Sequence, residues 1–503
     1  MYQLIEVLPN LLDIKLLIIL IAGVTVGMAI GSLPGLTATM GVALILPVTF
    51  GMGPVTGILL LVGVYFGAIY GGSIAAILIN TPGTPSSAAT VLDGHPLAKK
   101  GYAQKALTVS TISSAIGGVL SVIVLILVAP QLAVFALKFS APETFALAVF
   151  GMSVISGVAG KSLVKGFMML FVGLLICSIG LDPVGGFPRF TFGSTDLLGG
   201  VSFIAAMIGL FALSEAFQIV EEAFAKEKAI LALKKAKLKW KEFKGLIYTI
   251  LRSAGIGTFI GMIPGAGGDI ACFVAYNEAK RFAKKGEKFG EGELKGIAAP
   301  ETANNATTGG AMIPLLTLGI PGDAVTAVML GALMVQGLQP GPLLFQNHSE
   351  LVYTLFIGML LANILVLVIG LSAIRIVIKV LLIPKVIVGA IIVVLCMIGA
   401  YALGNNMFDV WIMVLFGIIG YFMKKYEYPA SPIILALILG PMMESNFRRS
   451  LLMADGDLTI FFTRPIAGIL LFLAFLTLFT PLFKEYFHRK NNKKSDADTN
   501  IAG

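Results

Sequence analysis

The chain has 503 residues, of which 57% are hydrophobic and only 13% charged, and its formal net charge is +9. Because soluble domains carry about 25% charged residues, this composition excludes an ordinary soluble globular protein. Apolar stretches long enough to cross a bilayer recur along the chain, roughly 11–15 segments in all. The sequence therefore predicts an all-α polytopic membrane protein.

The N-terminus reads MYQLIEVLPNLLDIK. It lacks a basic n-region and a small-residue cleavage site, so we expect no cleaved signal peptide. The three cysteines, Cys177, Cys272 and Cys396, are scattered through apolar stretches. This scatter predicts small core residues rather than a disulfide framework or a metal site.

Two Pro-Gly breaks interrupt the first apolar segments. The stretch AIGSLPGLTATMG contains Pro34 and Gly35, and NTPGTPSSAAT ends the long apolar run that begins at Pro54. Because proline removes a backbone donor and the residue before it avoids the helical conformation, we expect this helix to end near Asn80. Unpaired backbone in lipid is costly, so such a break is tolerated only inside protein or beside a water-filled cavity.

The residues after the second break supply hydrogen-bond donors. Ser86, Ser87 and Thr90 can begin a short helix, and the free N–H groups and dipole of a helix N-terminus favour an anion. The alternative is a structural kink stabilised by the hydroxyl groups. The ligand-binding residues expected in this half are Pro34, Gly35, Asn80, Thr81, Pro82, Gly83, Thr84, Ser86 and Ser87.

A basic block from Glu221 to Gly245 carries eight lysines, and the C-terminal tail is also basic. Lys and Arg accumulate in cytoplasmic loops of membrane proteins, which favours that interpretation over nucleic-acid binding. We expect a first membrane repeat at 1–220, a basic cytoplasmic linker at 221–246, a second membrane repeat at 247–483 and a basic cytoplasmic tail at 484–503.

The second half repeats the motifs of the first. FIGMIPGAGGDIA and AIGSLPGLTATMG share an I-G-x-x-P-G core, at Ile260–Gly265 and Ile30–Gly35. GGAMIPLLTLGIPGDAVTAV from Gly309 matches GGSIAAILINTPGTPSSAAT from Gly71, each with a Gly-Gly pair before a Pro-Gly break. Two matches in the same order indicate an internal duplication. The ligand-binding residues expected in the second half are Pro264, Gly265, Gly319, Pro321 and Gly322.

Charges around the motifs predict that the two repeats have inverted topology. In the first repeat the link between the breaks is uncharged and the following loop is basic, whereas in the second repeat this order is reversed. By the positive-inside rule, equivalent loops then lie on opposite faces. The short segments Leu36–Phe50 and Ala266–Asn277 are candidates for re-entrant hairpins. The loops expected in the cytoplasm are Lys99–Lys100, Lys234–Lys235 and Lys284–Lys285, and the 338–350 loop is expected outside.

Few ionisable residues interrupt the apolar regions, and each is costly at membrane depth unless it faces a cavity or a partner. In a helix, Glu301, Asn304, Asn305 and Thr308 share one face. Their carboxylate and amide oxygens suit a hard cation. The residues expected to bind a cation are Asp269, Glu301, Asn304, Asn305, Thr308 and Asp323.

Simpler roles stay open for three of the carboxylates. Glu301 can occupy a first helical turn after Pro300, and Asp323 can be a plain helix cap. Asp93 precedes a basic loop, and we expect it to be exposed.

Near the C-terminus, Arg448, Arg449 and Arg464 fall in a segment that the predicted topology places outside, against the positive-inside trend. Either they hold a docked protein or attract an anion, or the C-terminal topology differs by one crossing.

Several long motifs together resemble one known family. They are GSLPG, NTPGTPSSAATVLDGHPLAKKG, IPGAGG, PETANNATTGG, IPGDAVTAVMLGAL and GPMMESNFRRSLLMADGDLTIFFTRPI. From about Leu16 to Phe483 the chain resembles the large membrane subunit of the tripartite tricarboxylate transporters, the TctA family. The resemblance implies a secondary transporter driven by a cation gradient, which imports di- or tricarboxylates such as citrate across a bacterial or archaeal inner membrane. It also implies two partners, a small four-helix membrane subunit and a periplasmic substrate-binding protein.

Transport energetics agree with a coupled carrier. Moving one charge against 100 mV costs roughly 2.3 kcal/mol, so a trianion entering an inside-negative cell faces roughly 7 kcal/mol. The sequence contains no G-x-x-x-x-G-K-[ST] motif, which disfavours ATP hydrolysis. We therefore expect symport with Na⁺ or H⁺ as the coupling ion and no cofactor. A passive anion channel and a carrier of another small organic solute are the alternatives. An intramembrane enzyme is disfavoured, because there is no H-E-x-x-H and no nucleophile–base pair.

Overall fold

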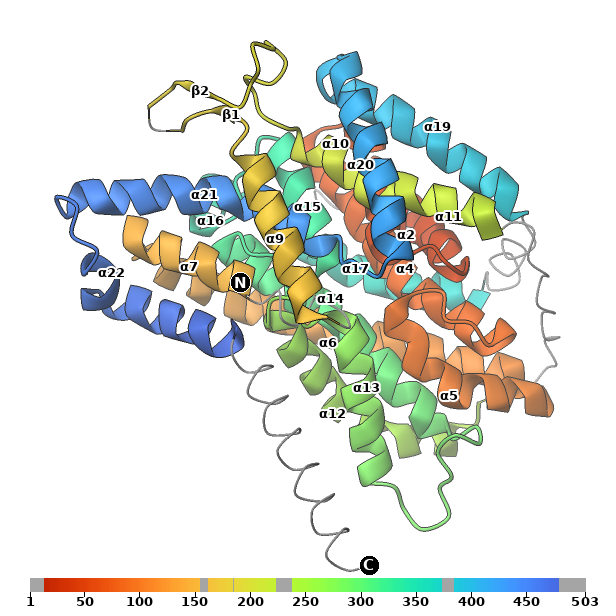
Figure 1. The fold of residues 1–503 in the computed structure, drawn as a ribbon. Helices are drawn as coiled ribbons and strands as arrows, with labels where there is room; N and C mark the ends of the chain where they lie inside the picture. The colour runs from red at the N-terminus through yellow and green to blue at the C-terminus, as the bar shows by residue number, and fades with distance from the viewer. Residues whose placement is uncertain (1–12, 154–161, 184, 223–237, 373–383, 479–503) are drawn as a thin grey trace, which may run out of the picture. The chain divides into compact units, whose positions relative to one another are not determined.

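The structure is a computed structural model that describes residues 13–153, 162–183, 185–222, 238–372 and 384–478. Within these residues it is almost entirely helical, with eight helices long and apolar enough to cross a membrane and four shorter apolar helices (Figure 1). The prediction of an all-α polytopic membrane protein is thus confirmed. The C-terminal tail at 484–503 and most of the basic linker at 221–246 lie outside the described residues.

The chain forms two compact units, each built from two separate stretches. The first contains Met1–Lys138 and Ser202–Lys425, and the second contains Phe139–Val201 and Tyr426–Gly503. These units cut across the repeat boundaries expected from the sequence, since each takes residues from both expected repeats.

The first half of the chain gives the first unit a series of helices separated by short breaks. Elements η1 and η2 are 3₁₀ helices and η3 is a π-helix. The series is α2 (Ile14–Ser32), α3 (Ala38–Ile45), η1 (Leu46–Thr49), α4 (Pro54–Ile79), η2 (Pro85–Ser87), α5 (Ala88–Leu97), η3 (Ala98–Tyr102) and α6 (Ala103–Ala136).

The second half supplies a comparable series, preceded by a span that contains a π-helix, η4, and followed by two long helices. The elements are α10 (Phe203–Met207), η4 (Ile208–Leu213), α11 (Ser214–Glu222), α12 (Trp240–Met262), α13 (Gly267–Arg281), α14 (Leu294–Leu318), α15 (Ala324–Val335), α16 (Pro342–Asn347), α17 (Ser349–Ser372), α19 (Lys385–Gly404) and α20 (Met407–Lys425).

Helices α2 and α4 pack together in the same way as α12 and α14. A Cβ atom built on Gly31 would lie 2.1 Å from the carbonyl oxygen of Ala68, and one built on Gly261 would lie 2.7 Å from that of Thr307. Small residues allow this close backbone approach between helices in a membrane protein. Since Gly31 and Gly261 are the same position of the I-G-x-x-P-G motif, the packing supports the duplication seen in the sequence.

The second Pro-Gly turns make equivalent contacts with these glycines. A Cβ atom built on Gly83 would lie 2.1 Å from the carbonyl oxygen of Gly31, and one built on Gly322 would lie 2.8 Å from that of Gly261. The duplicated motifs therefore mark the same packing contact in both halves. The opposite orientation of the two repeats stays a prediction.

The contacts also shift the alignment of the repeats by one residue. The Cβ atom built on Gly83 approaches Cα of Gly72 at 2.8 Å, and the one built on Gly322 approaches Cα of Ala311 at 2.7 Å. Gly72 is therefore equivalent to Ala311, and not to Gly310 as the paired Gly-Gly motifs indicate.

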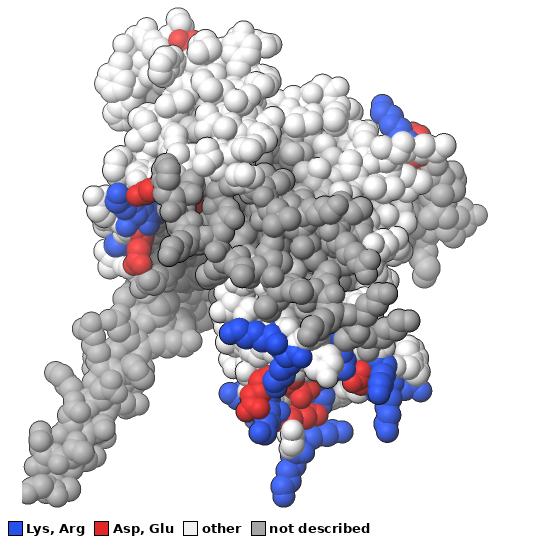
Figure 2. Space-filling view, turned by 90° about the vertical axis from the view of Figure 1, so that its right-hand side faces the viewer, with Lys and Arg blue, Asp and Glu red and all other residues white. Residues whose placement is uncertain are grey.

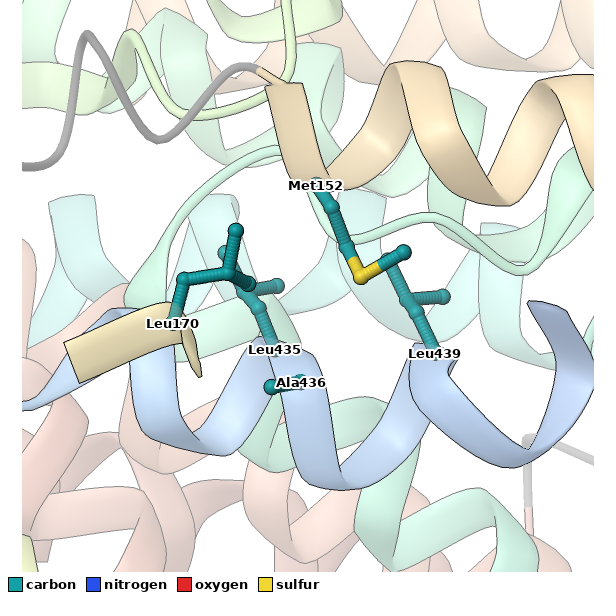
Figure 3. Close-up of a cluster of buried hydrophobic side chains, with 5 residues drawn as sticks. All are labelled: Met152, Leu170, Leu435, Ala436 and Leu439. Carbon is teal, nitrogen blue, oxygen red and sulfur yellow. The ribbon is translucent and has the colours of Figure 1, made fainter. Parts of the chain in front are cut away.

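The second unit is smaller. Its elements are α7 (Ala141–Ser153), α9 (Leu163–Cys177), the two-residue strands β1 (Gly180–Leu181) and β2 (Pro188–Arg189), α21 (Ser431–Met453) and α22 (Ile460–Thr463). Leu435, Ala436 and Leu439 of α21 pack against Met152 of α7 and Leu170 of α9 (Figure 3). This apolar cluster joins α7, α9 and α21.

Charged side chains of the first unit gather near its loops. Figure 2 shows Lys and Arg, interspersed with Asp and Glu, at the lower end, over the ends of α5 and α13 and the loop that follows α13. Lys100 Nζ donates to the carbonyl oxygen of Glu291 at 2.5 Å, and Lys105 pairs with Glu242 at the start of α12. The loops at 99–100 and 284–285 thus lie on one face, as the predicted topology requires. Lys234 and Lys235 lie outside the described residues.

Candidate functional site

Helices α4 and α14 carry polar side chains at equivalent positions. Tyr65 and Asn304 each stand three residues before the close helix contacts at Ala68 and Thr307, and both are fully buried. The Tyr65 hydroxyl donates to Oδ2 of Asp323 at 2.8 Å. A residue of the first half therefore reaches the start of helix α15 in the second half.

Tyr65 is absent from the site predicted from the sequence. The available signal was its place in a long apolar run, because a buried tyrosine hydroxyl normally finds a hydrogen-bond partner. The identity of that partner, Asp323, follows only from the packing.

Asn304 reaches toward the first half in turn. A Cβ atom built on Gly268 would lie 2.6 Å from Asn304 Oδ1 and 3.0 Å from Cβ of Ser86. Neither side-chain atom of Asn304 has a hydrogen-bond partner among the described residues. A buried unpaired polar group costs about 1–3 kcal/mol, and such groups in native proteins call for an explanation. Binding of a polar ligand is an explanation that the surrounding residues fit.

The N-terminus of helix α13 lies beside this amide. Gly267 begins the helix, and Asp269 is an exposed residue of its first turn. A Cβ atom built on Gly267 would lie 3.4 Å from Cβ of Asp323, and Asp269 and Asp323 interact electrostatically. Gly267 and Gly268 therefore lie between the carboxylate pair and Asn304.

The two Pro-Gly turns of the second half contact each other. The Gly265 N–H donates to the carbonyl oxygen of Gly322 at 2.6 Å. Gly319 ends α14 with φ of +71°, and Asp323 caps α15 by accepting from the Thr326 N–H at 2.7 Å. The predicted breaks at Pro264 and Pro321 are confirmed, since α12 ends at Met262 and α14 at Leu318. Asp323 is a helix cap that also binds Tyr65.

The break in the first half is confirmed as well. Helix α4 ends at Ile79, and Asn80 has φ of +56°. Thr84 and Ser87 form a capping box, and Ser86 Oγ lies 3.1 Å from Thr84 Oγ1. Ser87 thus stabilises the start of the short helix, whereas Ser86 lies next to Gly268, which also adjoins Asn304.

Gly83 packs tightly against backbone. Its N–H donates to the carbonyl oxygen of Gly72 at 3.1 Å, and a Cβ atom built on it would collide with the carbonyl oxygen of Gly31. The structure therefore explains this glycine by helix packing. Thr81 and Pro82 are half-buried.

Asn80 and Gly35, which were predicted to bind the ligand, have neighbours other than Asn304. Asn80 is exposed and lines an open cavity of about 680 Å³ with His95, Lys99 and Lys100. Gly35, which follows Pro34 at the end of α2, has φ of +96°, and a Cβ atom built there has one neighbour within 4 Å, Oε1 of Glu215 at 3.5 Å.

Glu301 is fully buried and faces hydroxyl groups of the first half. Its Oε1 accepts from Thr90 at 2.5 Å, and its Oε2 accepts from Ser110 at 3.2 Å and Ser114 at 3.0 Å. Helices α5 and α6 supply these donors. Carboxylate and hydroxyl oxygens are ligands of hard cations, so the group can hold either a cation or a proton.

The structure excludes the first-turn alternative for Glu301. Helix α14 begins at Leu294 and continues through Pro300, so Glu301 lies within the helix. Asn305 Nδ2 donates to the Glu301 carbonyl oxygen at 2.9 Å, and Thr308 Oγ1 donates to that of Asn305 at 2.6 Å. These two side chains bond to their own helix.

The expectation that Asp93 is exposed is wrong. Asp93 is fully buried, and its Oδ1 accepts from the N–H groups of Gly290, Gly292 and Glu293 at 2.7–2.9 Å. Its Oδ2 accepts from the Tyr276 hydroxyl at 2.9 Å. Asp93 therefore ties helix α5 to the loop between α13 and α14, which the local sequence could not reveal.

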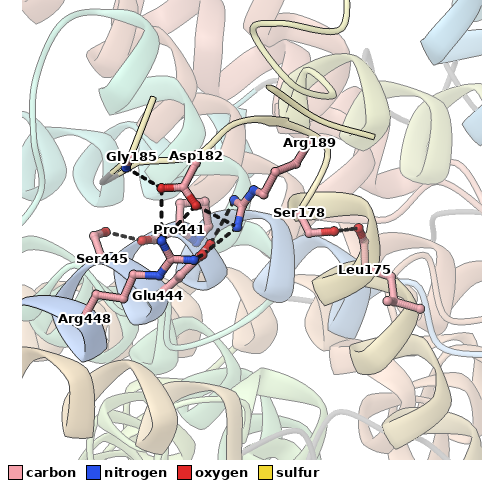
Figure 4. Close-up of polar contacts among 9 residues, drawn as sticks. All are labelled: Leu175, Ser178, Asp182, Gly185, Arg189, Pro441, Glu444, Ser445 and Arg448. Carbon is pink, nitrogen blue, oxygen red and sulfur yellow. Dashed lines mark hydrogen bonds and ion pairs between the residues drawn. The ribbon is translucent and has the colours of Figure 1, made fainter. Parts of the chain in front are cut away.

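In the second unit, Arg448 belongs to an ion-pair network (Figure 4). Its Nη1 donates to both carboxylate oxygens of Asp182, at 3.0 and 2.8 Å. Arg189 donates to both oxygens of Glu444, at 2.7 and 3.1 Å, and this hydrogen bonding raises the pKa of the Arg189 guanidinium. The network fastens the segment of β1 and β2 to α21.

The other two arginines of this region differ from each other. Arg464 Nη1 donates to Ser140 at 2.7 Å and pairs with Glu143 at 3.3 Å. Arg449 is exposed. Arg448 and Arg464 thus have partners inside the second unit, whereas Arg449 is the arginine of the three that faces outward.

The comparisons with known proteins give two uncharacterized relatives and one family. An uncharacterized 52.8 kDa protein of the TAR-I ttuC' 3'region in Agrobacterium vitis is 38% identical over 449 residues, which is 89% of each chain. An uncharacterized protein of the TAR-II ttuC' 3'region in Agrobacterium vitis is 37% identical over 226 residues, 45% of this chain and 93% of that protein. No solved structure matches. A model of the tripartite tricarboxylate transporter TctA family matches residues 17–435, and the chain belongs to this family.

Proposed function

We propose that this chain is the large membrane subunit of a cation-driven symporter that imports di- or tricarboxylates resembling citrate. It works across the inner membrane with a small four-helix subunit and a periplasmic substrate-binding protein. Family membership supports the general assignment. The single observation that carries the proposed site is the buried, unpartnered amide of Asn304 beside Ser86 and Gly268.

The donors around Asn304 suit a carboxylate. Asn304 Nδ2 and the Ser86 hydroxyl are donors, and Gly268, at the N-terminus of helix α13, lies next to both side chains. Helix N-termini bind anions through these N–H groups and the dipole, and hydrogen bonds to a charged group contribute about 1.5–3 kcal/mol each. A substrate carboxylate can therefore bind here without a fixed positive charge.

The coupling cation has two candidate sites among the predicted residues. Asp269 and Asp323 form one, next to the Tyr65 hydroxyl. Glu301 with its three hydroxyl donors forms the other. Binding a cation beside the Asp323 carboxylate offsets its repulsion of an anion at Asn304, and this links the two ligands energetically.

The site is closed in this structure, because the side-chain atoms of Asn304 are inaccessible to solvent. A substrate can reach them only after the broken helices move. Movement of one repeat against the other about a central site is the usual basis of alternating access.

Uptake in membrane vesicles tests the proposal. The vesicles contain both membrane subunits and are supplied with the binding protein. Labelled citrate and other di- and tricarboxylates are then added, with Na⁺ and proton gradients imposed separately. We expect accumulation of at least one carboxylate that depends on one of the gradients. Uptake that merely equilibrates, with or without a gradient, would indicate a passive channel and contradict the proposal.

A further inference from the structure

A carboxylate outside the predicted site borders the first Pro-Gly turn. Glu215 lies in the first turn of helix α11 and is buried. Its Oε1 is the atom that a Cβ built on Gly35 would approach at 3.5 Å. The π-helix η4 ends directly before α11. Such turns change the face on which later residues lie and are frequent at functional sites.

Lys424, in the last turn of helix α20, donates to the other oxygen of Glu215. Helix α11 packs against α20 (Figure 1). The Lys424 side chain is 28% exposed, compared with 11% for Glu215, and the neighbouring Lys425 is exposed. The ammonium group can therefore move away from the pair while the carboxylate stays beside Gly35.

The equivalent turn of the second half, at Pro264–Gly265, has a comparable environment. Helices α2 and α12 end at Ser32 and Met262, directly before the two turns. The partial negative charge of a helix C-terminus favours a cation, and transporters use such broken-helix ends to coordinate Na⁺. Asp269 and Asp323 lie beside the Pro264–Gly265 turn, and Glu215 lies beside the Pro34–Gly35 turn.

We propose that Glu215 binds a further coupling cation, a monovalent metal ion, at the Pro34–Gly35 turn, and that this ion displaces the Lys424 ammonium group. The inference rests on the proposed symport. A dicarboxylate carries two negative charges, so one monovalent cation leaves a net charge whose entry the membrane potential opposes. A separate site in the first half removes that charge.

Ion binding to the purified subunit tests the proposal without any substrate. Thermal unfolding is measured in increasing Na⁺, with choline as the replacement ion. We expect Na⁺ to stabilise the native protein with a Hill coefficient above that of Glu215→Gln. Glu221→Gln is the matched control, since Glu221 lies on the same helix and accepts from Tyr421 at 2.8 Å. A Glu215→Gln protein with the native Na⁺ dependence would overturn the proposal.

Uptake measurements separate ion binding from a merely structural ion pair. At 100 mV, loss of one coupled cation lowers the attainable accumulation by roughly 50-fold. We expect Glu215→Gln to reduce accumulation far more than it reduces substrate exchange. The swap of Glu215→Lys with Lys424→Glu restores the pair but moves the carboxylate away from Gly35, so we expect it to stay defective in accumulation.

Recovery of accumulation in the swapped protein would show that the pair only tethers α11 to α20, and the proposal would fall. If the native protein transports no carboxylate, the proposed function fails instead. In that case the Na⁺ dependence of thermal unfolding still decides whether Glu215 binds the ion.

Discussion

Asn304 differs from the other buried asparagines in having no hydrogen-bond partner. Asn305 and Asn363 each donate to a carbonyl oxygen of their own helix at 2.9 Å. We expect Asn304→Leu to raise the apparent KM for the carboxylate by about tenfold, which corresponds to about 1.4 kcal/mol. Because the native amide is unpaired, this change should not lower the thermal unfolding temperature.

Asn363→Leu serves as the matched control for this prediction. Its amide is buried in α17 and is paired, so its loss should lower thermal stability rather than substrate affinity. Uptake kinetics in vesicles and thermal unfolding in detergent measure the two effects. An unchanged KM for Asn304→Leu would remove Asn304 from the site.

Gly83 is the second residue whose role the structure makes specific. Since a Cβ atom there would lie 2.1 Å from the Gly31 carbonyl oxygen, even Gly83→Ala should be overpacked and cost about 1–3 kcal/mol of stability. Gly255→Ala is the control, because nothing lies within 4 Å of a Cβ atom at that helical position. Thermal unfolding compares the two. Equal stability of the two variants would mean that the Pro-Gly turn can shift to accommodate the methyl group without loss of stability.

The sequence could identify the polar break but not the task of each residue within it. Ser86 and Ser87 look alike in NTPGTPSSAAT, yet Ser87 caps a helix and Ser86 adjoins Gly268. Tyr65 and Glu215 gain their meaning from partners far away in the chain, so no local pattern could select them.

At the scale of elements, the helix breaks were predictable because proline and glycine act on the local backbone. The continuity of α14 was not, since it passes through Pro300 and Pro314. Its interior is almost completely buried, and tight packing by neighbouring helices tolerates prolines that would end an isolated helix.

The link between α5 and the loop before α14 depends on Asp93. Asp93→Asn replaces a charged acceptor of three N–H groups, and hydrogen bonds to charged groups contribute about 1.5–3 kcal/mol. We expect amide hydrogen exchange at Gly290, Gly292 and Glu293 to become about tenfold faster, as a loss of about 1.4 kcal/mol implies. Mass spectrometry of deuterated peptides from the purified protein measures this.

Glu287→Gln is the control for the loop. Glu287 pairs with Lys295 at 2.5 Å, and both side chains are partly exposed. Such pairs contribute about 0–1 kcal/mol, so exchange should change little. Equal rates in the two variants would show that the loop is held by other contacts.

At the scale of the whole molecule, the duplication and the compact units describe different properties. The repeated glycine contacts involve only the first unit, between Gly31 and Gly83 and between Gly261 and Gly322. The second unit combines Phe139–Val201 with the C-terminal region. Sequence similarity revealed the repeated parts, but the grouping of the other segments depends on long-range packing that no motif encodes.

The sidedness of the loops gives the last prediction. Lys100 bonds to the loop that contains Lys284, so both lie on one face, whereas Asn347 lines a cavity of about 990 Å³ with the starts of α2 and α4. Because basic loops stay in the cytoplasm, single cysteines at Lys99 and Lys284, in a protein whose three native cysteines are replaced, should react with an impermeant maleimide only from the cytoplasmic side. A cysteine at Asn347 should react only from outside. Labelling of Lys284→Cys from the same side as Asn347→Cys would rule out inverted repeats, because the basic link of the second half would then lie on the wrong face.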